Sequence, residues 1–289
     1  MIPGASNLRR TMKRGRLLTA LSISVLAAGL AASTAAAPVS TLDAVHRRGV
    51  LIVGVKADFP PFGYIDERGQ QVGFDVDLAH EVAAVVLGDP SRVKLRTVTS
   101  GNRIPMLLAN DVDAVMASMT ITQERKQTID FTVPYFCSGH LILVKAADAS
   151  INGFADLNGR RVSTVKGATG DAVTRVLAPR AERMTFDQNT AAVLALKDGR
   201  TDAFVQDDVL LLGLARQDPS LKVVGWPPQM PGPYGVGVRK GDKDLLGALN
   251  VALARLRASG VYDKMVAKWF GDVAGRLLPP AKCPPDLRL

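Results

Sequence analysis

The feature that most constrains the fold of this 289-residue chain is an alternation of strand-like and helix-like segments that occurs twice. A continuous apolar run over 50–55 is typical of a strand buried on both faces. Residues 75–87 then carry apolar side chains at helical spacing, and 93–98 alternate as a half-buried strand. A helix beginning at 104 and a short strand over 114–117 complete a β-α-β-α order. This order predicts a parallel-rich sheet covered by helices.

A second β-α-β-α order follows in the second half of the chain. We expect its strands at 140–145, 161–165, 184–186 and 203–205, and its helices at 171–177, 191–197 and 209–216. A further strand at 236–238 and two helices at 244–258 and 261–270 close the chain. The proline-rich stretch 227–233 is interpreted as a loop. The chain passes between the two α/β units near 141–145 and again near 234–239. Two crossings predict a hinged pair of lobes with a cleft that suits a small ligand.

The first 37 residues have the pattern of an export signal. Five basic residues precede an apolar stretch over 17–30, and small residues fill 31–37. The apolar stretch is short for a membrane span. We expect cleavage and export, with a retained signal anchor as the alternative. No later apolar run approaches the length of a span, so the mature protein is expected to be soluble.

Charge excludes one class of partner. The formal net charge of +9 falls to about +4 once the five basic residues of 1–37 are removed. No basic block with interleaved aromatic residues is present, so we expect no nucleic acid partner. The remaining surplus favours anionic ligands weakly.

A hydroxyl-rich segment over 118–125 leads into the start of a helix. Thr122 suits the N-cap, and Glu124 suits the positive end of the helix. Arg125 follows on the first turn, where its guanidinium and one or two hydroxyls can hold a small carboxylate at two points. The alternative is a surface arginine on a capped helix.

Two cysteines, Cys137 and Cys283, occur in a chain that is expected to be exported. They can pair in an oxidising compartment, which would tie the C-terminal tail back to the middle of the fold. Two unpaired thiols are the alternative.

Several motifs, taken together and in order, resemble a known family. They are Lys56–Phe62 (KADFPPF), 73–86 beginning GFDVDL, 102–105 (NRIP), 120–125 (TITQER) and 268–271 (KWFG). The chain resembles the extracellular solute-binding proteins, family 3, which deliver polar amino acids to ABC importers, over about 42–271. The resemblance implies a two-lobed α/β periplasmic binding protein fold of type II. Lobe 1 would comprise 38–142 and 236–275, lobe 2 would comprise 143–235, and 276–289 would be a tail.

The resemblance also implies roles for residues of the first lobe. Arg125 would grip the α-carboxylate of the ligand in a bidentate pair, and Ser118 and Thr120 would assist through a hydroxyl or a backbone amide. Phe59 falls where an aromatic ring usually packs on the ligand stem. Its alternative role is as a core residue.

In the second lobe, the resemblance assigns three residues to the ligand. Thr169 and the amide of Gly170 would close over the same carboxylate, and Asp207 would bind the α-ammonium. A helix cap is the alternative for Thr169, and a surface turn is the alternative for Asp207.

The side chain of the ligand is expected to meet Lys56 and Arg103. Two cations in one small site are costly unless an anion neutralises them, and relatives that bind aspartate or glutamate are similar at both positions. We therefore expect an acidic amino acid. The alternative is that Lys56 pairs with Asp58 or Asp75 and Arg103 with another loop acid, which would leave a neutral pocket for glutamine or asparagine.

The resemblance implies a monomeric periplasmic protein that needs no cofactor or metal and docks on an inner-membrane ABC permease. One alternative is an enzyme of the same fold, a cyclohexadienyl or arogenate dehydratase, which would need a general acid or base in the cleft. The three histidines His46, His80 and His140 are scattered, and nothing suggests that they converge. No nucleophile elbow, metal-ligand cluster or phosphate loop is present. A soluble sensor that docks on a receptor is a second alternative.

Overall fold

The computed structural model of the protein describes residues 40–271 and 282–288. The predicted export signal over 1–37 lies outside the described residues, as does the part of the tail before 282. The first described element is α1 (Thr41–Arg48), which begins where the hydroxyl of Ser40 accepts from the amide of Asp43 at 3.1 Å. This helix was not predicted from the sequence.

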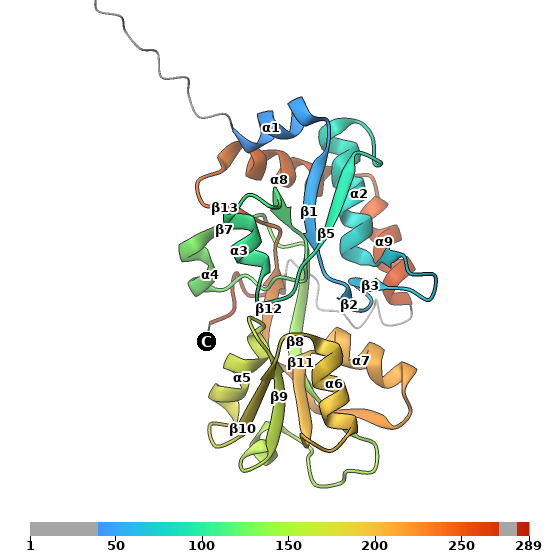
Figure 1. Cartoon of the computed structure of the whole chain (residues 1–289), viewed down its shortest axis with the longest axis vertical. Helices are drawn as coiled ribbons and strands as arrows, with labels where there is room; N and C mark the ends of the chain where they lie inside the picture. The colour runs from blue at the N-terminus through green and yellow to red at the C-terminus, as the bar shows by residue number, and fades with distance from the viewer. Residues whose placement is uncertain (1–39, 272–281, 289) are drawn as a thin grey trace, which may run out of the picture. The chain divides into compact units, whose positions relative to one another are not determined.

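The first sheet, which with its helices we call lobe 1, is mixed. Its strand order is β5 (Val93–Thr97), β1 (Leu51–Val55), β6 (Ala114–Val115), β13 (Gly237–Arg239) and β7 (Ile129–Phe131) (Figure 1). Strand β1 is parallel to both neighbours, and β13 is antiparallel to its own. A small antiparallel sheet lies beside it: β2 (Asp58–Phe59), β3 (Gly63–Ile65) and β4 (Gln71–Val72).

The helices of lobe 1 come from both ends of the chain. They are α1, α2 (Phe74–Leu87), α3 (Arg103–Leu108), α4 (Gln123–Thr128), α8 (Lys243–Ala258) and α9 (Val261–Phe270). Helix α2 is apolar on the face that packs on the core, where Leu78 and Val82 are fully buried. Helices α8 and α9 pack against α2, so the last part of the chain returns to the first lobe.

The second sheet, which with its helices we call lobe 2, repeats the pattern. Its order is β10 (Glu182–Phe186), β9 (Arg161–Val165), β11 (Ala203–Asp207), β8 (Phe136–Lys145) and β12 (Leu221–Tyr234). Strands β10, β9 and β11 are parallel, and β8 is antiparallel to β11 and β12. Its helices are η1 (Phe154–Leu157), α5 (Thr169–Leu177), α6 (Asn189–Lys197) and α7 (Asp208–Gln217). The two-lobed α/β fold is confirmed. The sheets are mixed rather than parallel-rich, because each has two parallel and two antiparallel pairings.

The two connections between the lobes are the long strands β8 and β12, which we call the hinge strands (Figure 1). The prediction of a loop over 227–233 is wrong, because this stretch is part of β12. The pairing with β8 shifts register between Val224 and Gln229 and again between Gln229 and Gly232. Proline has no N–H to donate, and irregularities of this kind leave room for it in a strand.

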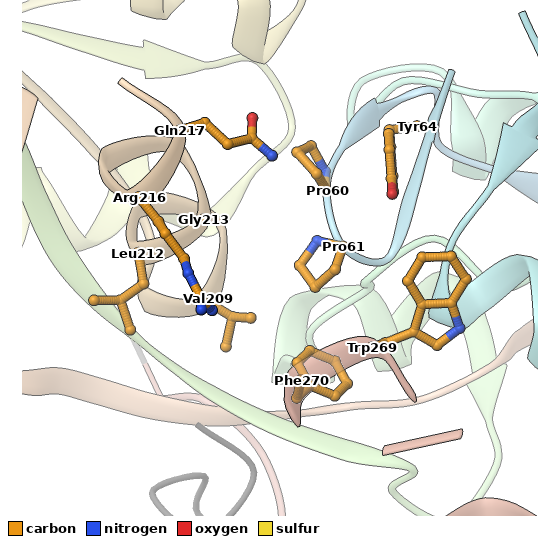
Figure 2. Close-up of a pocket in the computed structure, with 10 residues that line it drawn as sticks. All are labelled: Pro60, Pro61, Tyr64, Val209, Leu212, Gly213, Arg216, Gln217, Trp269 and Phe270. Atoms are coloured by element: carbon orange, nitrogen blue, oxygen red, sulfur yellow. The ribbon is translucent and has the colours of Figure 1, made fainter. Parts of the chain in front are cut away.

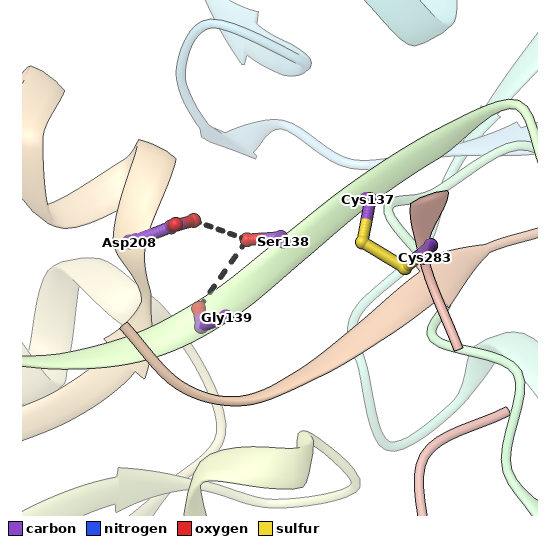
Figure 3. Close-up of a disulfide and its surroundings, with 5 residues drawn as sticks. All are labelled: Cys137, Ser138, Gly139, Asp208 and Cys283. Atoms are coloured by element: carbon purple, nitrogen blue, oxygen red, sulfur yellow. Dashed lines mark hydrogen bonds between the residues drawn. A yellow bond between two sulfur atoms is a disulfide. The ribbon is translucent and has the colours of Figure 1, made fainter. Parts of the chain in front are cut away.

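A disulfide ties the end of the described chain to one hinge strand. Cys137 in β8 is bonded to Cys283, with Cα atoms 5.9 Å apart and a separation of 146 positions in sequence (Figure 3). The residues after Cys283 run along α4 of lobe 1. The amide of Leu287 donates to the carbonyl of Ile121 at 2.9 Å, and Asp286 accepts from Lys126 at 2.8 Å.

Candidate functional site

The N-terminus of α4 presents Arg125, as its capping pattern predicts. The hydroxyl of Thr122 accepts from the amide of Arg125 at 3.1 Å, which fixes the first turn. The half-buried guanidinium donates to the carbonyl of Thr120 at 2.6 Å and to the carbonyl of Gly167, in lobe 2, at 2.8 Å. Only two of its five N–H groups are used in these bonds, so donors remain for a carboxylate.

Arg103, at the start of α3, reaches the same carbonyl. Its guanidinium donates to the carbonyl of Ala117 at 2.6 Å, and it lies 3.4 Å from the carbonyl oxygen of Gly167. Its Nε is buried and has no hydrogen-bond partner among the described residues. The oxygen of Gly167 therefore joins the two guanidinium groups of lobe 1 to the loop that precedes α5 of lobe 2.

Lys56 follows β1 and is almost completely buried. Its ammonium donates to the hydroxyl of Ser100 at 2.8 Å and lies 4.2 Å from the ring centroid of Phe59. Phe59 also belongs to the hydrophobic core. The expected alternative of a pair with Asp58 or Asp75 is not what the structure shows, because Asp58 accepts from the amide of Asn189 instead.

Three cations of lobe 1 thus share one buried site. Burial, reinforced by Arg103, lowers the pKa of Lys56 to about 7, although nearby aspartates oppose this shift. Burial and the charge of Arg125 lower the pKa of Arg103 to about 9, and burial lowers that of Arg125 to about 10. Both arginines remain charged at neutral pH. The charged forms lose solvation that the protein only partly replaces, so an anion would be stabilised here.

Asp75, on the first turn of α2, is a buried hydrogen-bond acceptor that holds Ser118 and Tyr135 in place near these cations. Its carboxylate accepts from the hydroxyl of Tyr135 at 2.8 Å and from the amide and hydroxyl of Ser118 at 2.8 and 3.1 Å. Ser118 adopts φ 48°, a left-handed conformation that is rare for residues other than glycine. Burial raises the pKa of Asp75 to about 6 despite these bonds. Ser118 therefore supports the site through Asp75.

Lobe 2 supplies an acid, a hydroxyl and an imidazole. Asp207, at the end of β11, accepts a hydrogen bond from the hydroxyl of Tyr234 through Oδ2. Its Oδ1 lies 3.4 Å from Nε2 of His140, which is also 2.8 Å from the hydroxyl of Thr169. Gly170 follows on α5, and a Cβ there would lie 2.5 Å from the carbonyl oxygen of Val205. The start of α5 thus needs glycine to approach β11.

The residues proposed from the sequence therefore occur in two groups. Arg103 and Arg125 meet at Gly167, with Lys56 close enough to Arg103 for their charges to interact. Thr169 and Asp207 meet at His140. No role at the ligand site was predicted from the sequence for five residues in these groups: Asp75, Ser100, Tyr135, His140 and Tyr234. The available signals were the motif that contains Asp75 and the histidine that begins the expected strand 140–145.

A separate cavity of about 200 Å³ lies outside these groups (Figure 2). Pro60, Pro61 and Trp269 of lobe 1 line one side, and Leu212 and Arg216 of α7 line the other. It includes none of the residues that the sequence assigns to a ligand. Within 40–271 and 282–288, no three histidine, cysteine or acidic side chains are placed to hold a metal ion.

Comparison with known proteins defines the class. The chain matches the model of the bacterial extracellular solute-binding proteins, family 3, over residues 51–272. It is 37% identical over 234 residues to the ABC transporter glutamine-binding protein GlnH of Bacillus subtilis (strain 168), covering 80% of this chain and 85% of that protein. It is 40% identical over 223 residues to the glutamine-binding protein of Geobacillus stearothermophilus, covering 76% and 84%.

A solved structure agrees. An ancestral arginine-binding protein bound to glutamine is 41% identical and superimposes with a TM-score of 0.74, covering 78% of this chain and 99% of that one. The protein belongs to family 3 of the bacterial extracellular solute-binding proteins, and is similar to substrate-binding components of amino-acid ABC transporters. These relatives bind solutes and are not enzymes. In the described part of the chain, no helix has the length and hydropathy to cross a membrane.

Proposed function

We propose that the protein captures an acidic L-amino acid, glutamate or aspartate, between its two lobes and delivers it to an ABC permease. Arg125 binds the α-carboxylate together with the hydroxyl of Thr169 and the amide of Gly170. Asp207 binds the α-ammonium. The side-chain carboxylate lies between Lys56 and Arg103.

The observation that carries this proposal is the set of partners around Lys56 and Arg103. Among the residues that the structure describes, Lys56 has only an uncharged hydroxyl as a hydrogen-bond partner, and the guanidinium of Arg103 has only backbone carbonyls. Buried cations with neutral partners are costly, and a second carboxylate on the ligand would neutralise both. A cationic side chain, such as that of arginine, would add a further positive charge and is disfavoured.

Glutamine is the second candidate, because two similar relatives are named as glutamine-binding proteins. Its amide oxygen would accept from Lys56, and its amide nitrogen would need an acceptor. The two candidates differ in charge, so Lys56 should discriminate between them.

The contacts across the lobes support a closing mechanism. The carbonyl of Gly167 already touches both arginines of lobe 1, so the loop before α5 is in position to cover a ligand held there. Bending of the hinge strands would bring Thr169 and Asp207 to the ligand. Closure excludes water, and the closed form is the one that a permease would recognise. We extend the proposal to export, with 1–37 as a cleaved signal and the mature monomer in the periplasm.

The test is calorimetric titration of the ligand-free mature protein with glutamate, aspartate, glutamine and arginine. We expect the acidic amino acids to bind with the lowest Kd. Arg125→Lys should weaken every ligand at least tenfold, because a single ammonium cannot form the bidentate pair. Lys56→Met should weaken glutamate far more than glutamine. Tightest binding of glutamine, with no effect of Lys56→Met on selectivity, would favour the second candidate.

A further inference from the structure

One imidazole links the two proposed ligand-binding side chains of lobe 2. Only 1% of the surface of His140 is exposed to solvent. Its Nε2 lies 2.8 Å from Oγ1 of Thr169 and 3.4 Å from Oδ1 of Asp207. Its Nδ1 lies 3.3 Å from the carbonyl oxygen of Gln229. His140 thus touches α5, β11 and both hinge strands, since it lies on β8 and Gln229 lies on β12.

The neighbours of His140 restrict the direction of its bonds. The carboxylate of Asp207 and the carbonyl of Gln229 can only accept, whereas the hydroxyl of Thr169 can donate or accept, so the tautomer of His140 sets the direction. With the proton on Nε2, the imidazole donates toward Asp207 and Thr169. When Oγ1 of Thr169 accepts from Nε2, the proton of the hydroxyl itself remains free. That proton is then available to a ligand carboxylate.

Asp207 is held at both oxygens by the hinge strands. His140 of β8 faces Oδ1, and the hydroxyl of Tyr234 of β12 donates to Oδ2. The strand register places His140 directly opposite Asp207 and opposite Gln229. The direction in which the carboxylate points is therefore coupled to the arrangement of the two hinge strands.

We propose that His140 is a positioning residue for ligand capture, which aims the hydroxyl of Thr169 and the carboxylate of Asp207 at the amino-acid backbone of the ligand. This role rests on the proposed function. It is distinct from ligand contact, because His140 acts through the two side chains that it orients.

The test compares two amides at one position. In His140→Gln the amide nitrogen can stand near the place of Nε2 and donate to Thr169. In His140→Asn the side chain is shorter, so its amide nitrogen cannot reach Thr169. Calorimetry with glutamate or glutamine, whichever binds more tightly, should show Kd raised about 10- to 100-fold in His140→Asn, as expected for hydrogen bonds to charged groups. His140→Gln should stay within about fivefold of the parent. Equal weakening by both amides, at matched melting temperature, would overturn the inference.

Thr169→Val separates this inference from the function on which it rests. In a Thr169→Val background, His140→Asn should weaken binding by a smaller factor than in the parent, because one of its two targets is gone. Full additivity would overturn the positioning role. If Thr169→Val binds as tightly as the parent, the proposed site itself is wrong. If Thr169→Val is weakened and His140→Asn is not, only the role of His140 fails.

Discussion

The ammonium of Lys56 donates to the hydroxyl of Ser100 at 2.8 Å, and both side chains are buried. The hydroxyl of Ser100 is an uncharged partner, so it stabilises the buried ammonium less than a carboxylate would. Burial, with the charge of Arg103, therefore leaves the pKa of Lys56 at about 7. A lysine in this state is sensitive to the charge of whatever binds beside it.

The first prediction follows from this lysine. An anionic side chain beside Lys56 raises its pKa, so binding of glutamate takes up a proton above about pH 7. Affinity for glutamate should be constant below pH 7 and fall by up to tenfold per pH unit above it, until the pKa of the bound state is reached. Titration in buffers of different ionisation enthalpy measures the proton directly. Glutamine should show a much shallower dependence, and a flat profile for glutamate between pH 6.5 and 9 would contradict the assignment.

The second prediction concerns Asp75. Its pKa is about 6 in the folded protein and near 3.8 when unfolded, so the folded state binds the proton more tightly. Its contribution to the free energy of unfolding should therefore fall as pH rises from 4 to 6, by about 2 kcal/mol. Asp75→Asn should abolish this contribution. The measurement is the free energy of urea unfolding of the parent minus that of the variant across that range. Carboxylates with a lowered pKa, such as Asp218, have the opposite pH dependence in both proteins, so their contribution cancels in this difference. A difference that does not vary with pH would refute it.

The third prediction tests closure at Gly167. Its φ is +75°, and a Cβ there would lie 2.5 Å from the carbonyl oxygen of Ser100 in lobe 1. Gly167→Ala should therefore keep the lobes apart and raise Kd at least tenfold. Gly159, also in lobe 2, has φ +78° and nothing within 4 Å of such a Cβ. Gly159→Ala is the matched control: it should carry similar backbone strain and lower the melting temperature comparably, yet leave Kd unchanged. Equal affinities of the two variants would argue against closure through this contact.

The fourth prediction concerns the disulfide. Cross-linking of distant residues restricts the unfolded chain, so replacing both Cys137 and Cys283 by serine should lower the free energy of unfolding by about 2–4 kcal/mol. Reductant should destabilise the parent by a similar amount and leave the double variant unaffected. If reductant lowers the stability of both proteins equally, the effect does not come from this bond.

Much of the fold could be predicted because its main elements carry their own signals. The buried run of β1 and the apolar face of α2 locate these elements to within one residue, and the cap at Thr122 locates α4. The short strands β2, β3, β4 and β7 carry no periodic pattern and were missed. The pairing of β12 across 227–233 depends on its partner β8, which local sequence does not reveal.

The place of Arg125 at the start of α4 was predictable, because the capping pattern at Thr122 marks it. The contacts of Asp75 and His140 were not predictable. Asp75 lies in a recognised motif, yet its bonds to Ser118 and Tyr135 depend on tertiary packing. His140 meets Asp207 only through the antiparallel register of β8 and β11. Residues that orient ligand contacts are set by such pairings rather than by sequence pattern.

The bond between Cys137 and Cys283 encloses every element of lobe 2 after the start of β8, together with β13, α8 and α9, in one covalent ring. A protease that cuts one surface loop of lobe 2 would open this ring without dividing the molecule. The nicked protein would migrate as a single species until a reductant separates its two pieces. Damage to lobe 2 would therefore not release it from lobe 1, which holds Arg103 and Arg125.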